Sequence, residues 1–374
     1  MLTSFNPYPF ERLNLLIKDI KPNTPKITNL TIGEPQFQTP QVIQNALKDS
    51  VSLLNKYPKS KGEDFLIEAQ LDFIAHRFGV QLSSAEIIPT FGTREVLFNF
   101  PQFLLHGKET PTIAYPSPFY QIYEGGAIAS GATAILMPLT AENHFKPSLT
   151  QEDLQRVHLV ILNSPNNPTG SVLGIDELQQ WVEYALKYDF VVLNDECYSE
   201  IYQHTPPPSI LEASKLAKND TFKNVLALNS ISKRSSAPGL RSGFIAGDRE
   251  ILKFYRQYRT YLGCALPLPL QHASAKAWQT SGEEIRKCYA RNLEIAQELF
   301  SEIVISPYTF YLWLKVKDDL AITKKLYQEA GILVLPGRFL GKNGEGFIRV
   351  ALVYPDDIML PALKTLKTFL DQEI

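Results

Sequence analysis

The chain has 374 residues, of which 44% are hydrophobic and 20% charged, and its 37 Lys and Arg residues nearly balance its 39 Asp and Glu residues. This length predicts about two domains, and the formal charge of −2 lacks the basic surplus typical of nucleic-acid binding. The hydrophobic fraction and the aromatic residues spread along the chain exclude a disordered protein.

Cysteine usage and the apolar segments predict a cytoplasmic protein. Cys197, Cys264 and Cys288 lie far apart and lack the spacing of metal ligands, so we expect reduced thiols and no metal site. Pro7 and Pro9 interrupt the segment where a signal peptide would be continuously apolar. No later apolar run is long enough to span a bilayer, and we expect no membrane partner.

Between about residues 85 and 250, short β-branched segments alternate with amphipathic ones. The predicted strands are 86–92, 110–116, 132–139, 159–165, 190–196, 224–230 and 242–247. The predicted helices are 93–105, 119–131, 176–189 and 249–262. Alternating strands and helices indicate an α/β unit with a mostly parallel sheet.

The two ends of the chain have a different pattern. The first residues form a proline-broken arm, whereas a charged helical run at 283–303 precedes strand patterns at 310–316, 332–337 and 346–353 and a closing helix. We therefore predict an arm and part of a small domain at 1–42, a large domain at 43–275, and a small α+β domain at 276–374.

Polar residues follow several of the predicted strands. Asn167 lies in the loop after the strand at 159–165, and Asp195 and Tyr198 lie at and just past the end of the next strand. Lys233 and Arg241 follow the strand after that. Loops at the carboxyl ends of strands form the ligand crevice of an open α/β sheet. Each motif alone is weak, but their joint occurrence in one chain order indicates a ligand site.

On these motifs, and on Gly33 and Arg349 near the two ends, the chain resembles the pyridoxal-phosphate (PLP) aminotransferases of class I/II, fold type I. The resemblance implies a large domain whose mixed, mostly parallel seven-stranded sheet lies between helices, and a smaller α+β domain. It also implies PLP as cofactor, small amino acids and 2-oxo acids as substrates, and a homodimer with shared active sites. Within the family, the segments SPFYQIYEGGA, NDECYSEIY and SISKRSSAPGLRSGFIAGD are most similar to the bacterial N-succinyldiaminopimelate aminotransferases.

The resemblance implies a catalytic set around the PLP ring. Lys233 would hold the cofactor covalently and later move the proton of the substrate α-carbon, and burial beside cations would help its amine lose a proton. Asp195 would pair with the pyridine nitrogen and keep it protonated. Tyr198 and Asn167 would donate to the 3-hydroxyl oxygen, and the isomer of the bond before Pro168 stays open.

The phosphate of PLP would need backbone amides, hydroxyls and one fixed cation. A strand-to-helix turn favours an anion because free N–H groups and the helix dipole point at it. Arg241 suits the phosphate because its planar fork donates two hydrogen bonds. The predicted set is Gly92, Thr93, Arg94, Ser230, Ser232 and Arg241.

Two aromatic residues complete the implied cofactor site. Tyr120 would stack on the pyridine ring, with the adjacent Phe119 as the competing assignment. Tyr57 would reach the phosphate in the neighbouring subunit, or else is an ordinary exposed tyrosine.

Substrate binding is assigned to arginines. Arg349 lies in an apolar strand pattern, so its charge needs an anionic partner: the substrate α-carboxylate, with Gly33 and Asn167 beside it, or an internal acid. An N-succinylated substrate has a second, distant carboxylate. Arg259 is the candidate for that group, with Arg94 and Arg234 as alternatives, although a helix rich in Arg and Tyr is usually a packing face.

The predicted reaction moves an amino group from N-succinyl-LL-2,6-diaminopimelate to 2-oxoglutarate, in lysine and diaminopimelate synthesis. Aspartate-, aromatic- or alanine-type aminotransferases and PLP carbon-sulfur lyases share most of these residues and stay as alternatives. A PLP-binding regulator would need a basic DNA-binding segment, for which residues 1–30 offer no room.

Overall fold

Seven strands form the central sheet, in the order β2-β8-β7-β6-β5-β3-β4. In the computed structural model, which describes residues 5–373, strand β8 is antiparallel to β2 and β7, and the other neighbours are parallel. The predicted mixed, mostly parallel sheet is therefore confirmed. The strands are β2 (Ile87–Thr90), β3 (Thr112–Ser117), β4 (Thr133–Pro138), β5 (Leu159–Asn163), β6 (Val191–Asp195), β7 (Val225–Ser230) and β8 (Gly243–Gly247).

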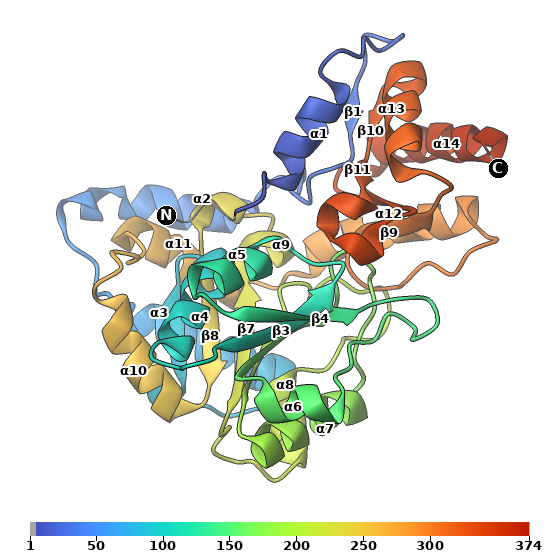
Figure 1. The fold of residues 1–374 in the computed structure, drawn as a ribbon. Helices are drawn as coiled ribbons and strands as arrows, with labels where there is room; N and C mark the ends of the chain where they lie inside the picture. Colours follow the sequence, from blue (N-terminus) through green and yellow to red (C-terminus); the bar gives the residue numbers. More distant parts are fainter. Residues whose placement is uncertain (1–4, 374) are drawn as a thin grey trace.

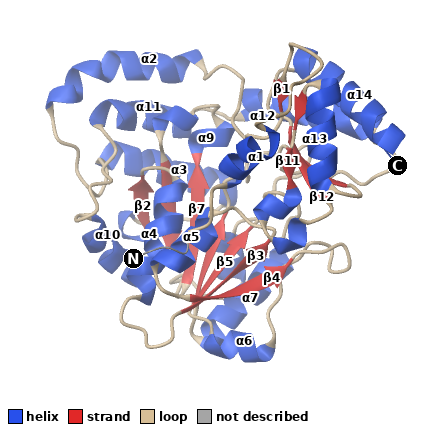
Figure 2. Ribbon diagram, turned by 45° about the horizontal axis from the view of Figure 1, so that its top comes forward, coloured by secondary structure: helices blue, strands red, loops and turns tan. Residues whose placement is uncertain are grey.

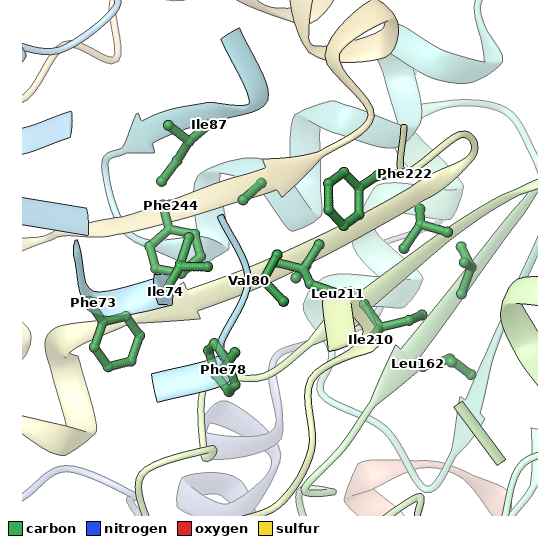
Figure 3. Packing of buried hydrophobic residues seen from close by; sticks show 14 of the residues in the cluster. Phe73, Ile74, Phe78, Val80, Ile87, Leu162, Ile210, Leu211, Phe222 and Phe244 are labelled. Atoms are coloured by element: carbon green, nitrogen blue, oxygen red, sulfur yellow. The ribbon is translucent and has the colours of Figure 1, made fainter. Parts of the chain in front are cut away.

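Helices cover both faces of this sheet (Figure 2). The inner strands β5, β6 and β7 are buried at every position, because successive side chains enter opposite cores. Val160 and Leu162 belong to one core, with residues of the helices at 64–78, 175–188, 210–216 and 268–279. Ile161 belongs to the other core, with residues of the helices at 93–105, 122–129 and 249–259. Figure 3 shows part of the first core, where Phe73 lies near Phe244.

The helices begin close to the predicted positions, with one exception. Helix α5 begins at Ile122 rather than at 119, because the backbone N–H of Phe119 donates to the carbonyl of Leu340 and residues 118–121 form a loop. The α-helices of the sheet region are α2 (Gln41–Ser50), α3 (Asp64–Phe78), α4 (Thr93–Leu105), α5 (Ile122–Ala129), α6 (Gln151–Arg156), α7 (Ile175–Tyr188), α8 (Ile210–Leu216), α9 (Ile231–Arg234), α10 (Arg249–Arg259) and α11 (Leu268–Gln279).

The C-terminal residues form a second layer of strands and helices. An antiparallel sheet has the order β11-β12-β9, and β1 pairs in parallel with β10. The predicted strand at 332–337 is thus divided between two sheets. The elements are β1 (Thr28–Asn29), β9 (Tyr311–Lys315), β10 (Ile332–Leu333), β11 (Leu335–Pro336), β12 (Phe347–Ala351), α12 (Glu283–Leu299), α13 (Asp319–Ala330) and α14 (Asp356–Glu373).

Helix α1 (Pro9–Ile17) joins the N-terminal arm to this layer. Leu13 packs with Leu333 and Phe339, and Figure 1 shows α1 beside α13. The predicted domain boundaries at 42/43 and 275/276 stay predictions, and residues 1–4 of the predicted arm lie outside the described residues. No helix within residues 5–373 has the length and apolarity needed to cross a membrane.

Candidate active site

A cavity of about 960 Å³ lies at the carboxyl ends of β5, β6 and β7, between the large sheet and the C-terminal layer. Such a position is where open α/β sheets bind ligands. The structure brings most of the predicted site residues to its wall. These are Gly33, Thr93, Arg94, Tyr120, Asn167, Asp195, Tyr198, Ser230, Ser232, Lys233, Arg241 and Arg349.

Lys233 lies on the single turn α9, directly after β7. Its amine donates to the carbonyl oxygen of Gly33. Burial lowers the pKa of Lys233 to about 8, and the positive charges of Arg349 and Arg241 act in the same direction. A lysine amine that is partly neutral near pH 7 to 8 is a competent nucleophile and proton acceptor.

Asp195, the last residue of β6, has a buried carboxylate held by two donors. The hydroxyl of Tyr123 donates to Oδ2 at 2.9 Å, and the backbone N–H of Cys197 donates to Oδ1 at 3.2 Å. Burial raises the pKa of Asp195, and these two hydrogen bonds oppose the rise. Sequence reasoning missed Tyr123, although it follows Tyr120 by three residues and lies in the first turn of α5.

Arg349 on β12 is 4% exposed and has no carboxylate within 4 Å among residues 5–373. Its Nη1 donates to Oδ1 of Asn167 at 2.9 Å and its Nη2 to the carbonyl of Thr31 at 2.6 Å, while Nε has no partner there. The guanidinium also lies 4.4 Å from the centre of the Tyr311 ring. The internal ion pair that the sequence left open is therefore not observed, and the charge is available to an anion.

Tyr198 and Tyr311 meet near this arginine. Their hydroxyl oxygens are 3.2 Å apart, and both residues line the cavity. Sequence reasoning missed Tyr311. Its signal was a hydroxyl at the start of an otherwise apolar strand pattern. The Asn167–Pro168 bond, whose isomer the sequence left open, is cis.

The hydroxyls of Ser230 and Ser232 and the guanidinium of Arg241 line the cavity at the carboxyl end of β7 and the N-terminal end of α4. We call these three residues the cradle. Ser230 caps α9 by accepting from the backbone N–H of Ser232 at 3.1 Å. Arg241 has the left-handed backbone (φ 53°, ψ 49°) that is uncommon for a residue other than glycine. Gly92, with φ 73°, lies against the Arg241 guanidinium, so a side chain at this position would collide with it.

Arg94 belongs to the strand-to-helix turn whose backbone N–H groups are predicted to bind the phosphate, and its side chain turns toward two tyrosines. Its Nε donates to the Tyr120 hydroxyl at 2.8 Å and its Nη2 to the Tyr8 hydroxyl at 3.0 Å. Tyr120 lines the cavity, whereas Phe119 packs into the core edge-on against Tyr115. Tyr8, in the proline-broken arm, had no signal of its own in the sequence.

Arg259 does not fit the role of reading a distal carboxylate. Its side chain is 2% exposed and bonds both oxygens of Glu95, at 2.7 and 3.1 Å. The interpretation of this helix as a packing face describes Arg259 better. Glu95 already neutralises the charge of Arg259, and Arg259 is absent from the cavity wall.

Arg234 and Tyr57 also lie away from the cavity. Arg234 donates to the carbonyls of Ala277 and Thr280 at the end of α11 and lies over the Phe73 ring, so it anchors α9. Tyr57 is fully exposed and could act only in the site of a second copy.

Comparison with known proteins identifies the family. The model of aminotransferase class I and II matches residues 25–364. The chain is 31% identical to an LL-diaminopimelate aminotransferase of Natranaerobius thermophilus, covering 97% of both proteins. The crystal structure of aminotransferase AspB from Helicobacter pylori has a TM-score of 0.97 with 52% identity, covering 99% of this chain and 100% of that one. An aminotransferase from Neisseria meningitidis has a TM-score of 0.93 with 37% identity, covering 100% and 99%.

The chain therefore belongs to the class I and II aminotransferases, and it is a PLP-dependent enzyme. The family resemblance drawn from the sequence is confirmed, whereas the N-succinyldiaminopimelate subgroup is not. The residues on the cavity wall fit the cofactor: an amine, Lys233, whose pKa is about 8, a buried carboxylate, Asp195, and a cradle of hydroxyls with Arg241. PLP, when bound, supplies the electron sink for the α-carbanion of an amino acid.

Proposed function

We propose that this aminotransferase acts on an amino acid with a second anionic group, and that the substrate pair is N-succinyl-LL-2,6-diaminopimelate and 2-oxoglutarate. The products would be N-succinyl-2-amino-6-oxopimelate and glutamate. The main support for amino-acid binding is Arg349, a buried guanidinium that lines the cavity and has no acidic partner within residues 5–373. Two parallel hydrogen bonds to an α-carboxylate would hold the substrate amine toward Lys233.

The polar residues predicted to hold the cofactor then have the following proposed tasks. Lys233 would hold the cofactor covalently and would accept the proton of the substrate α-carbon. Asp195, oriented by Tyr123, keeps the pyridine nitrogen protonated. Tyr198 and Asn167 bind the 3-hydroxyl oxygen. The cradle of Ser230, Ser232, Arg241 and the first amides of α4, including that of Thr93, binds the phosphate.

We also propose a homodimer, in which Tyr57 reaches the phosphate in the partner's site. Large apolar side chains are exposed elsewhere too: Leu54, three residues before Tyr57, is 72% exposed, and Tyr261 is 85% exposed. A second copy would remove these surfaces from water. Sedimentation should give twice the chain mass, and Tyr57→Phe should weaken PLP binding without changing that mass.

A second candidate substrate is LL-diaminopimelate itself, because relatives about 30% identical have the name of that activity. Unlike the succinylated compound, it has a free ammonium at its far end. Aspartate-, aromatic- or alanine-type transamination and carbon-sulfur lysis complete the set to be tested.

The test is a half-reaction screen on the PLP enzyme. Each candidate amino acid is mixed with it, conversion of PLP to pyridoxamine phosphate is followed by absorbance, and the oxo-acid product is identified by mass spectrometry. We expect the largest kcat/KM for N-succinyl-LL-diaminopimelate. A larger value for LL-diaminopimelate, or release of pyruvate and ammonia from cystathionine, would replace the proposal with the corresponding alternative.

A further inference from the structure

Four basic side chains line the described part of the cavity: Lys233, Arg241, Arg349 and Arg94. The first three have tasks at the cofactor or at the α-carboxylate. Arg94 has none, because its guanidinium turns from the cradle to Tyr120 and Tyr8. Among these four, Arg94 is thus the one whose positive charge has no proposed role in binding the cofactor or the α-carboxylate.

The surroundings of Arg94 leave its charge uncompensated. Both hydrogen-bond acceptors are neutral phenols, whose rings lie 5.6 and 5.8 Å from the guanidinium carbon. Within residues 5–373 no carboxylate is within 4 Å, since the neighbouring Glu95 is bonded to Arg259. Nη1 has no hydrogen bond to any residue in that range. A guanidinium held by two phenols and open on one side is arranged to bind an anion.

Arg94 and Arg349 occupy different depths of the cavity. Arg349 is buried, whereas Arg94 is exposed on the first turn of α4. Tyr120 also lines the cavity, and its hydroxyl orients Arg94. An amino acid held at its α-carboxylate by Arg349 would extend its side chain toward the opening, where Arg94 faces it.

We propose that Arg94, held by Tyr8 and Tyr120, binds the anionic group at the far end of the substrate and so selects amino acids with a distal carboxylate. This inference rests on the proposed function and adds the residue that sets its substrate class. Tyr8 precedes α1, which packs on the C-terminal layer, whereas Arg94 belongs to α4 of the large domain. The Arg94–Tyr8 hydrogen bond therefore connects the N-terminal arm to the large domain.

The test compares acids with amides of the same shape. Transamination is measured with glutamate and glutamine, and with N-succinyl-LL-diaminopimelate and its succinamide analogue, for the wild type and for Arg94→Gln. We expect the acid/amide ratio of kcat/KM to fall about tenfold, the value of one charge-assisted hydrogen bond. Binding of glutarate and butyrate by calorimetry gives a readout without turnover, and only glutarate should bind more weakly to Arg94→Gln.

Arg249→Gln is the matched control, because it removes the same charge from a side chain that is 62% exposed and outside the cavity wall. It should leave the acid/amide ratio unchanged. If the acid/amide ratio of kcat/KM is unchanged in Arg94→Gln, whether or not both rates fall, the assignment of Arg94 is wrong and the transamination reaction itself is not affected by that result. A wild type that converts no amino acid would instead overturn the proposed function, and this inference with it.

Discussion

Asp195 and Arg94 line the same cavity but differ in their burial and in the groups that hold them. We call the buried part around Asp195 the floor of the cavity and the exposed part around Arg94 its opening. Asp195 is buried and held by a core tyrosine and a backbone amide, so its position is set before any ligand binds. Arg94 is exposed and held by phenols from two segments, one of them 86 residues away in the arm. The floor thus has the fixed geometry that the common chemistry needs, whereas the opening can change with the substrate.

Replacing Lys233 should have the largest effect. Lys233→Ala removes both the covalent attachment and the proton acceptor, so we expect kcat to fall by on the order of 10⁴-fold. Mass spectrometry after borohydride reduction should find the pyridoxyl group on Lys233 of the wild type. A label on another lysine would contradict the assignment.

Asp195→Asn tests the floor without removing the cofactor link. The amide cannot stabilise a protonated pyridine nitrogen, so we expect kcat to fall about a hundredfold or more. Asp189→Asn is the matched control, because Asp189 is an exposed residue at the end of α7 with φ 57°, where asparagine is well tolerated. Full activity of Asp195→Asn would show that ring protonation does not depend on this carboxylate.

Arg349→Lys separates substrate binding from cofactor binding. A lysine cannot form the two-bond clamp, and the loss of about 2 kcal/mol would raise KM roughly thirtyfold. PLP absorbance and Tm should stay near those of the wild type. If the variant loses PLP or unfolds, Arg349 is a structural residue instead.

The pH dependence of cofactor attachment reports on the burial of Lys233. Because its pKa is lowered to about 8, the neutral fraction of the amine should rise about tenfold between pH 7 and 9 and then level off. An ordinary lysine would gain about a hundredfold over that range and continue to rise. Rates of activity recovery after adding PLP to the apoenzyme distinguish the two profiles.

The floor was largely predictable from the sequence and the opening was not. Asp195 ends a buried strand, and Lys233 and Asn167 follow two others. The sheet brings the carboxyl ends of these neighbouring parallel strands together. The sequence did not predict the site contacts of Tyr123 and Tyr311, because their hydrogen-bond partners are 72 and 113 residues away. Tertiary packing determines contacts at that separation. Arg259 failed for the same reason: the sequence does not reveal that Glu95, 164 residues earlier, neutralises it.

Tyr8→Phe should have the smallest effect and is confined to the opening. The substitution keeps the ring against Arg94 and removes one neutral acceptor, which is worth about 1 kcal/mol or less. The acid/amide ratio of kcat/KM should therefore fall about threefold, with kcat on the amide and PLP binding unchanged. Tyr184→Phe, on α7 and outside the cavity wall, is the matched control. A Tyr8→Phe variant that loses turnover on acid and amide equally would mean that the arm supports the floor of the cavity, and the division between a fixed floor and an adaptable opening would then be wrong.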